Sequence, residues 1–184
     1  MKSITAIRNS VVALALGVGS SVMPASTLFA EPAPPRPTIE VTTRDVAASN
    51  AKVQAAYDAL VTMWSADFKQ IGERFAAPEI MRYRSPIRTG CGVMTPSNAG
   101  YCPVDNTIYF DDIFVAAQAK TAANALGTDG DMAGLGVIAH EMGHAVAMQL
   151  GHASRVSYEN ESVADCLAGA FGQACPGRWL ARER

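Results

Sequence analysis

The residues best able to do chemistry in this sequence are His140, Glu141 and His144, which form the pattern His-Glu-x-x-His. The apolar spacing over residues 132–150 predicts a helix that ends at Gly151, and on a helix positions i and i+4 share a face. Two imidazoles on one face can bind a zinc ion, and a neighbouring glutamate can take a proton from water that the metal has acidified to a pKa of about 7. The pattern therefore predicts one zinc ion per chain, with the two histidines as ligands and Glu141 as general base.

A hydrolytic zinc site takes three protein ligands and keeps one position open. His152 is the other histidine, but it lies eight residues after His144, whereas the extended form of the motif needs a histidine six residues after it. Glu161 is the better candidate, because it stands four residues before Asp165 on the next predicted helix and shares its face. We expect Glu161 to bind the metal and Asp165 to accept the second N–H of a ligand histidine.

Two other side chains compete for the third position. Glu159 is two residues from Glu161, about 160° away around the helix. Cys166 could supply a thiolate, although a disulfide or a buried thiol is the preferred interpretation in an exported chain.

The elements that must position these residues are predicted from apolar spacing, turn residues and caps. Residues 80–87 alternate less clearly, and their arginines, with Arg88, favour a solvated strand face over an anion site. Glycines at 134, 136 and 143 predict close packing around the site. The expected elements are a helix over 46–68 capped by Ser49 or Asn50, a strand over 106–110, a helix from Asp112 to about Leu126, a turn over 127–131 with a capping Asp131, and a last helix over 160–171.

Composition and charge describe the class of protein. The chain has 184 residues, 49% of them apolar, which suits one compact domain. Its 15 Lys and Arg against 17 Asp and Glu give a net charge of -2, so no basic surface favours nucleic-acid binding.

The N-terminus predicts export. Residues 1–30 carry Lys2 and Arg8, then an apolar run over 11–18, then small residues up to Ala30, which is typical of a secretory signal peptide, with an uncleaved anchor as the alternative. Residues 31–38 form a proline-rich linker, and the folded domain is expected over 39–184. We therefore expect a secreted or periplasmic protein with no stable membrane span after cleavage.

The four cysteines fall into two close pairs, which an oxidising compartment can join. Cys91 with Cys102 is the favoured disulfide, because glycines and prolines around it predict a loop that needs a crosslink. Cys166 with Cys175 is a weaker second pair, with buried free thiols as the alternative.

With these residues identified, the chain resembles the bacterial neutral zinc metallopeptidase family, which carries His-Glu-x-x-His followed by a Glu-x-x-x-Asp helix. The resemblance implies an α+β, zincin-like fold, with helices on a small, mostly antiparallel sheet. It implies zinc on His140, His144 and Glu161, catalysis by Glu141 and an orienting Asp165, and it matches the strand over 106–110 to the edge strand along which zincins align an extended peptide. The blocks that carry the resemblance lie at 64–72, 91–92, 101–105, 108–111 and 164–169.

The expected function is an exported zinc endopeptidase acting on a peptide or protein substrate. Tyr158, Tyr109, His152 and Arg155 are candidate oxyanion donors, and Tyr158 and His152 are preferred because they lie between the ligand helices. The alternatives are a zinc-stabilised, catalytically silent binding module and a hydrolase of a non-peptide amide such as a cell-wall crosslink.

Overall fold

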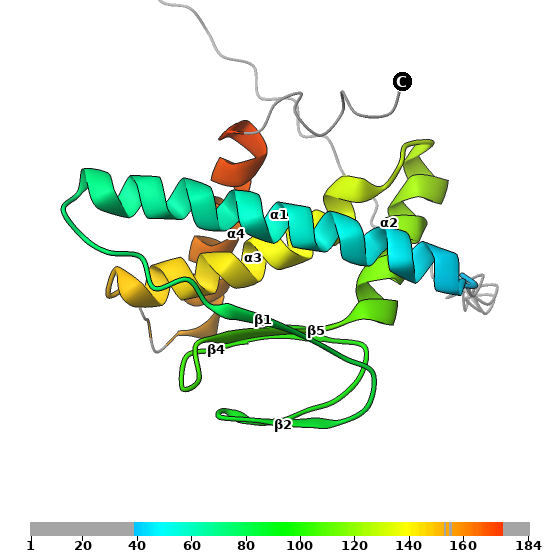
Figure 1. Ribbon diagram of the computed structural model, residues 1–184, viewed down its shortest axis with the longest axis horizontal. Helices are drawn as coiled ribbons and strands as arrows, with labels where there is room; N and C mark the ends of the chain where they lie inside the picture. Colours follow the sequence, from blue (N-terminus) through cyan, green and yellow to red (C-terminus); the bar gives the residue numbers. More distant parts are fainter. Residues whose placement is uncertain (1–38, 153, 155, 175–184) are drawn as a thin grey trace, which may run out of the picture. The chain divides into compact units, whose positions relative to one another are not determined.

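The computed structural model describes residues 39–152, 154 and 156–174, so the predicted signal segment and linker, Arg155 and Cys175 lie outside the described residues. This part of the chain is α+β, with helices α1, α3 and α4 on one side of a small sheet and a hairpin on the other (Figure 1). None of its helices is long and apolar enough to cross a membrane. The elements are α1 (Thr43–Gln70), β1 (Glu79–Tyr83), β2 (Ile87–Thr89), β3 (Gly92–Met94), β4 (Ala99–Cys102), β5 (Thr107–Asp111), α2 (Asp112–Leu126), α3 (Asp131–Gln149) and α4 (Ser157–Ala174).

Helix α1 begins earlier than its apolar pattern predicts. Its N-cap is Thr42, not Ser49 or Asn50, because Thr42 and Asp45 form a capping box in which each side chain accepts from the other residue's backbone N–H. The two bonds satisfy donors that a helix start leaves unpaired, and they extend the helix by a turn. The buried stripe that includes Leu60 and Trp64 then packs on the sheet and on α3.

The main sheet has the order β1-β5-β4 and is mixed, because β1 runs parallel to β5 and β4 runs antiparallel to it. Strand β5 matches the strand predicted over 106–110, but all of its residues are buried and it lies in the centre of the sheet. The expectation that it is the edge strand was wrong. The edge strand beside α3 is β4, which the glycines and prolines of this region had predicted to be loop.

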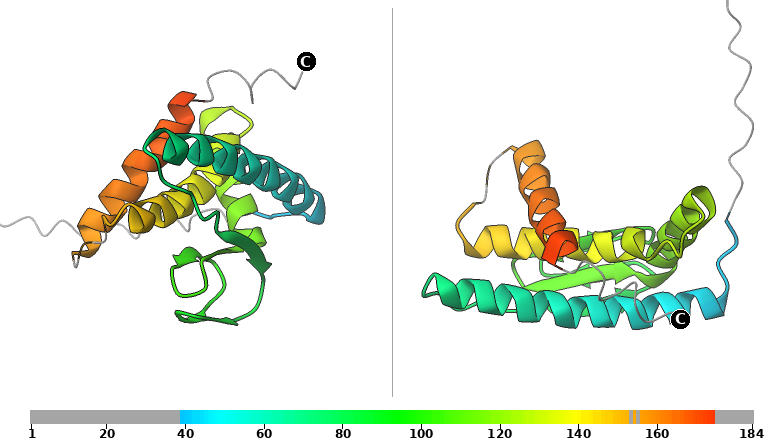
Figure 2. Two further views of the ribbon diagram at one scale, coloured as in Figure 1. Left: turned by 60° about the vertical axis from the view of Figure 1, so that its left-hand side comes forward. Right: turned by 90° about the horizontal axis from the view of Figure 1, so that it is seen from above.

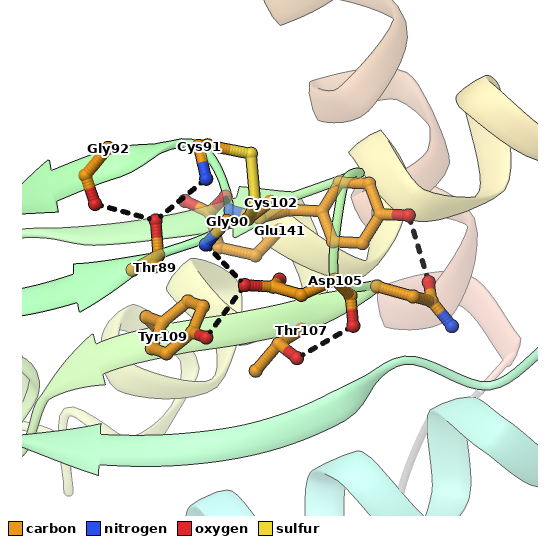
Figure 3. Close-up of a disulfide and its surroundings, with 11 residues drawn as sticks. Thr89, Gly90, Cys91, Gly92, Cys102, Asp105, Thr107, Tyr109 and Glu141 are labelled. Atoms are coloured by element: carbon orange, nitrogen blue, oxygen red, sulfur yellow. Dashed lines mark hydrogen bonds between the residues drawn. A yellow bond between two sulfur atoms is a disulfide. The ribbon is translucent and has the colours of Figure 1, made fainter.

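The hairpin β2–β3 covers the opposite face of the sheet, where Tyr83, Cys102 and Tyr109 form a second small core. The predicted disulfide between Cys91 and Cys102 is confirmed, and it ties the hairpin turn to the end of β4 (Figure 3). Asp105 reinforces the tie, since its Oδ2 accepts from the backbone N–H of Gly90 and from the Tyr109 hydroxyl. By contrast, Cys166 is a free, exposed thiol, so the second disulfide is not formed at this residue.

One arginine of the cluster within residues 80–88 forms an ion pair in the structure. Arg84 donates two bonds, at 2.7 and 2.8 Å, to the buried carboxylate of Asp112. The cap of α2 is the preceding residue, Asp111, whose side chain accepts from the N–H groups of Ile113 and Phe114. Asp112 is therefore free to bind Arg84 and Asn50.

Helix α4 runs across α3 rather than along it (Figure 2). Gly143 permits the crossing, because a Cβ there would lie 2.6 Å from the backbone oxygen of Ala164. A Cβ added at Gly134 would make ordinary van der Waals contacts with α2, and a Cβ added at Gly136 would meet nothing within 4 Å. Close packing therefore explains only part of the glycine pattern. At the start of α3, Asp131 lies in the first turn and binds Lys52; the N-cap position is Gly130.

Candidate metal-dependent active site

Helices α3 and α4 bring the predicted ligand residues together. His140 Nε2 lies 3.1 Å from His144 Nε2 and 3.0 Å from Glu161 Oε2, and His144 Nε2 lies 3.5 Å from the same carboxylate oxygen. His140 Nδ1 lies 2.8 Å from Asp165 Oδ1. The carboxylate predicted to bind metal and the one predicted to orient a histidine thus face the two different nitrogens of one ring.

The spacing of the three atoms suits zinc. Ligands about 2.1 Å from a tetrahedral ion stand about 3.4 Å apart, which the three distances bracket. The donor and acceptor roles of the two His140 ring nitrogens also favour a metal ion. When His140 donates from Nδ1 to Asp165, the lone pair of a neutral His140 Nε2 faces the Glu161 oxygen, which is also an acceptor. A cation between these atoms would turn two facing acceptors into two ligands, so the donor set fits a zinc ion.

Burial adjusts the charges of two residues of α3. Burial, with a smaller effect of His140, lowers the pKa of His144, which keeps its imidazole neutral and available as a ligand. Burial likewise raises the pKa of Glu141 to about 6, although His140 and a hydrogen bond oppose the shift. That bond runs from the Tyr101 backbone N–H to Glu141 Oε2 at 2.9 Å, so the predicted base contacts strand β4 directly.

These residues line one pocket of about 530 Å³. Its walls come from α3 and α4 on one side and from β4 on the other, with the turn after β4 at one end. The lining residues are Asn98, Ala99, Gly100, Tyr101, Pro103, His140, Glu141, His144, Ala147, Met148, His152, Asn160 and Glu161.

The sequence profile of one protein family, described as "Putative neutral zinc metallopeptidase", matches residues 3–180. The chain belongs to this family. Membership supports hydrolase chemistry at a coarse level and implies zinc, for which His140, His144 and Glu161 form the candidate site.

The relatives of this chain are longer than the region that matches it. The uncharacterized protein YpfJ of Escherichia coli K12 is 35% identical over 130 residues, which cover 60% of this chain and 43% of YpfJ. The uncharacterized proteins Mb2605 of Mycobacterium bovis and Rv2575 of Mycobacterium tuberculosis H37Rv are each 31% identical over 141 residues, covering 70% of this chain and 46% of theirs. The chain thus spans under half the length of these curated relatives. No solved structure was found to match.

Of the other residues predicted for the site, the structure places some in the pocket and others outside it. Of the four candidate oxyanion donors, His152 lines the pocket, whereas Tyr158 is 79% exposed and outside the lining. The Tyr109 hydroxyl donates to Asp105, and Arg155 lies outside the described residues. The rival ligand Glu159 accepts a hydrogen bond from the hydroxyl of Ser154.

The sequence analysis did not predict the wall that β4 contributes to this pocket. Ala99, Gly100 and Tyr101 lie in a stretch whose composition predicts loop, and a four-residue strand carries too few side chains for a clear alternation. The predicted disulfide was the available signal, because it marks Cys102 as a point where the chain must be fixed.

Proposed function

We propose that this family member is an exported, zinc-dependent endopeptidase of zincin-like fold. The observation that carries the proposal is the meeting, in one pocket, of three ligand groups, a buried carboxylate and the edge strand β4 of the sheet. His140, His144 and Glu161 would hold the metal, and Asp165 would fix the tautomer and orientation of His140.

Zinc, when bound, would polarise the scissile carbonyl and acidify a water molecule. Glu141 takes the proton from the attacking water and later delivers it to the leaving amine. Its raised pKa suits both roles, because a carboxyl group that titrates near 6 can accept and release a proton near neutral pH. His152 is the preferred oxyanion donor, because it lines the pocket while Tyr158 does not.

Strand β4 would bind the substrate backbone. In an antiparallel pair every second residue turns its N–H and C=O away from the partner strand. The N–H of Tyr101 points away from β5, to Glu141, so Ala99, two residues earlier, presents its backbone groups in the same direction. An extended peptide can pair with this edge whatever its sequence, which favours a protein or peptide substrate.

A catalytically silent zinc-binding module remains the second candidate. A structural zinc site closes its fourth position with protein. Within the described part of the chain, the ligand cluster holds three groups, and a buried Glu141 stands beside it. A structural site needs no such base, so this arrangement favours catalysis over the silent module.

The test is casein cleavage by the purified protein, with and without a chelator. We expect cleavage that the chelator stops and added zinc restores. Glu141→Gln should retain zinc and lose about 10²-fold or more of the rate. Stoichiometric zinc without cleavage of casein or a peptide library would support the binding module. Cleavage of a cell-wall amide in place of these substrates would show that the enzyme acts on a non-peptide amide.

A further inference from the structure

A polar network joins the two walls of the pocket. Tyr101 lies at its centre: its backbone N–H donates to Glu141 on α3, and its hydroxyl donates to Asn106 Oδ1 at 2.9 Å. Asn106 follows the turn after β4. The position of the strand edge against α3 therefore depends on what holds Asn106.

Asn106 is fixed by both its backbone and its side chain. Its φ of 49° lies in the left-handed region, which asparagine tolerates better than most residues. Its Nδ2 donates to the backbone oxygens of Ala76 and Ala77, both at 3.3 Å, and its own backbone oxygen accepts from the Glu79 N–H at 2.8 Å. Since Nδ2 faces two acceptors, Oδ1 is left to accept from Tyr101, so one amide orientation satisfies every partner.

The network closes on the end of the active-site helix. Gln149, the last residue of α3, accepts from the Ala76 N–H at 2.8 Å and donates to the Ala76 oxygen at 3.0 Å. The connector between α1 and β1 is thus bonded to α3 on one side and to the β4–β5 turn on the other. Of its two bonding partners, Gln149 adjoins Met148 in the sequence and Asn106 lies in the same turn as Pro103; Met148 and Pro103 line the pocket.

We propose that Asn106 is a positioning residue that sets the distance between β4 and the end of α3, and so the affinity of the pocket for an extended peptide. It acts through Tyr101 and the Ala76 backbone and touches neither the ligands nor Glu141. The kinetic part of the proposal rests on the proposed function; the geometric part does not.

The test compares Asn106→Gly, which keeps the positive φ and deletes the amide, with Gln54→Ala, which deletes an amide that donates to Asp58 on α1. Asn106→Gly removes three side-chain hydrogen bonds, and we expect a KM for peptide about tenfold higher, with kcat within about twofold and zinc content unchanged. Gln54→Ala should match the wild type. An unchanged KM, or a loss confined to kcat, would overturn the proposal.

Tyr101→Phe provides a second variant that removes only the hydroxyl and keeps the backbone bond to Glu141. It should raise KM in the same direction, and the double variant with Asn106→Gly should add little, because both changes break one link. Fully additive effects would show that the two residues do not act through their shared hydrogen bond. If Asn106→Gly fails to fold, the KM of Tyr101→Phe alone tests the proposal.

Hydrogen exchange separates this proposal from the proposed function. The Tyr101 amide should exchange about tenfold faster in Asn106→Gly than in the wild type or Gln54→Ala. Faster exchange in a protein that cleaves nothing would leave the positioning role standing and reject the peptidase. Unchanged exchange would reject the positioning role even in an active enzyme.

Discussion

Helix α3 and strand β4 form opposite walls of the same pocket, yet they are specified differently. In α3 the local sequence is enough to place two ligands together, because His140 and His144 share a face wherever the helix forms. Strand β4 has four residues, and it is held by β5, by a disulfide and by bonds from its turn. The two histidine ligands are thus locally encoded, whereas the strand edge depends on contacts made elsewhere in the chain.

The largest expected effect tests the packing that brings α4 to α3. Gly143→Ala should destabilise the fold by about 3 kcal/mol and weaken zinc binding, because the added Cβ would lie 2.6 Å from the Ala164 oxygen. Gly136→Ala is the matched control on the same helix. Its Cβ meets nothing within 4 Å, so it should be neutral or stabilising by up to about 1 kcal/mol. Urea unfolding measures both, and equal effects would show that α4 does not press on α3 at Gly143.

The next effect tests the sheet wall. Replacing Cys91 and Cys102 together by serine should lower stability by about 2–3 kcal/mol and reduce peptide cleavage, while zinc stays bound. Cys166→Ser should change stability by less than about 0.5 kcal/mol, because that thiol is free and exposed. Loss of zinc in the double variant would mean that the two walls are not independent.

A smaller effect should follow from the carboxylate behind His140. Asp165→Asn keeps the shape of the side chain but weakens the hold on His140 Nδ1, and we expect zinc affinity to fall about 10- to 100-fold. Competition with a chromogenic chelator measures the change. Wild-type affinity in this variant would remove Asp165 from the account of the site.

The smallest expected effect is on the pH dependence of stability, through the ion pair between Arg84 and Asp112. The bonds from Arg84 hold the pKa of Asp112 below its ordinary range, despite burial. A carboxyl group whose pKa is lowered on folding contributes stability that is complete above its unfolded pKa of about 3.9 and is lost as pH falls through the folded value. Asp112→Asn should flatten the stability profile below about pH 4, and an unchanged slope in urea titrations would show that the pair carries no such dependence.

The sequence predicted what local patterns encode. Most of the helices, one strand and the set of residues that meet at the site follow from spacing along the chain, one disulfide follows from the loop residues around it, and the α+β class was implied by the family resemblance. Strand β4, the central place of β5 and the Thr42 cap did not, because each depends on a partner that spacing does not show. A strand is central only when chains on both sides pair with it, and a cap is recognised only when the residue three positions later returns the bond.

The most direct test of the central claim is the zinc content of the purified protein beside Glu161→Ala and Glu159→Ala. The two glutamates lie two residues apart on α4, but only Glu161 reaches the histidines, while Glu159 binds Ser154. We expect one zinc per chain in the wild type and in Glu159→Ala, and greatly weakened binding in Glu161→Ala. Full zinc in Glu161→Ala, or none in the wild type after zinc is supplied, would contradict the account.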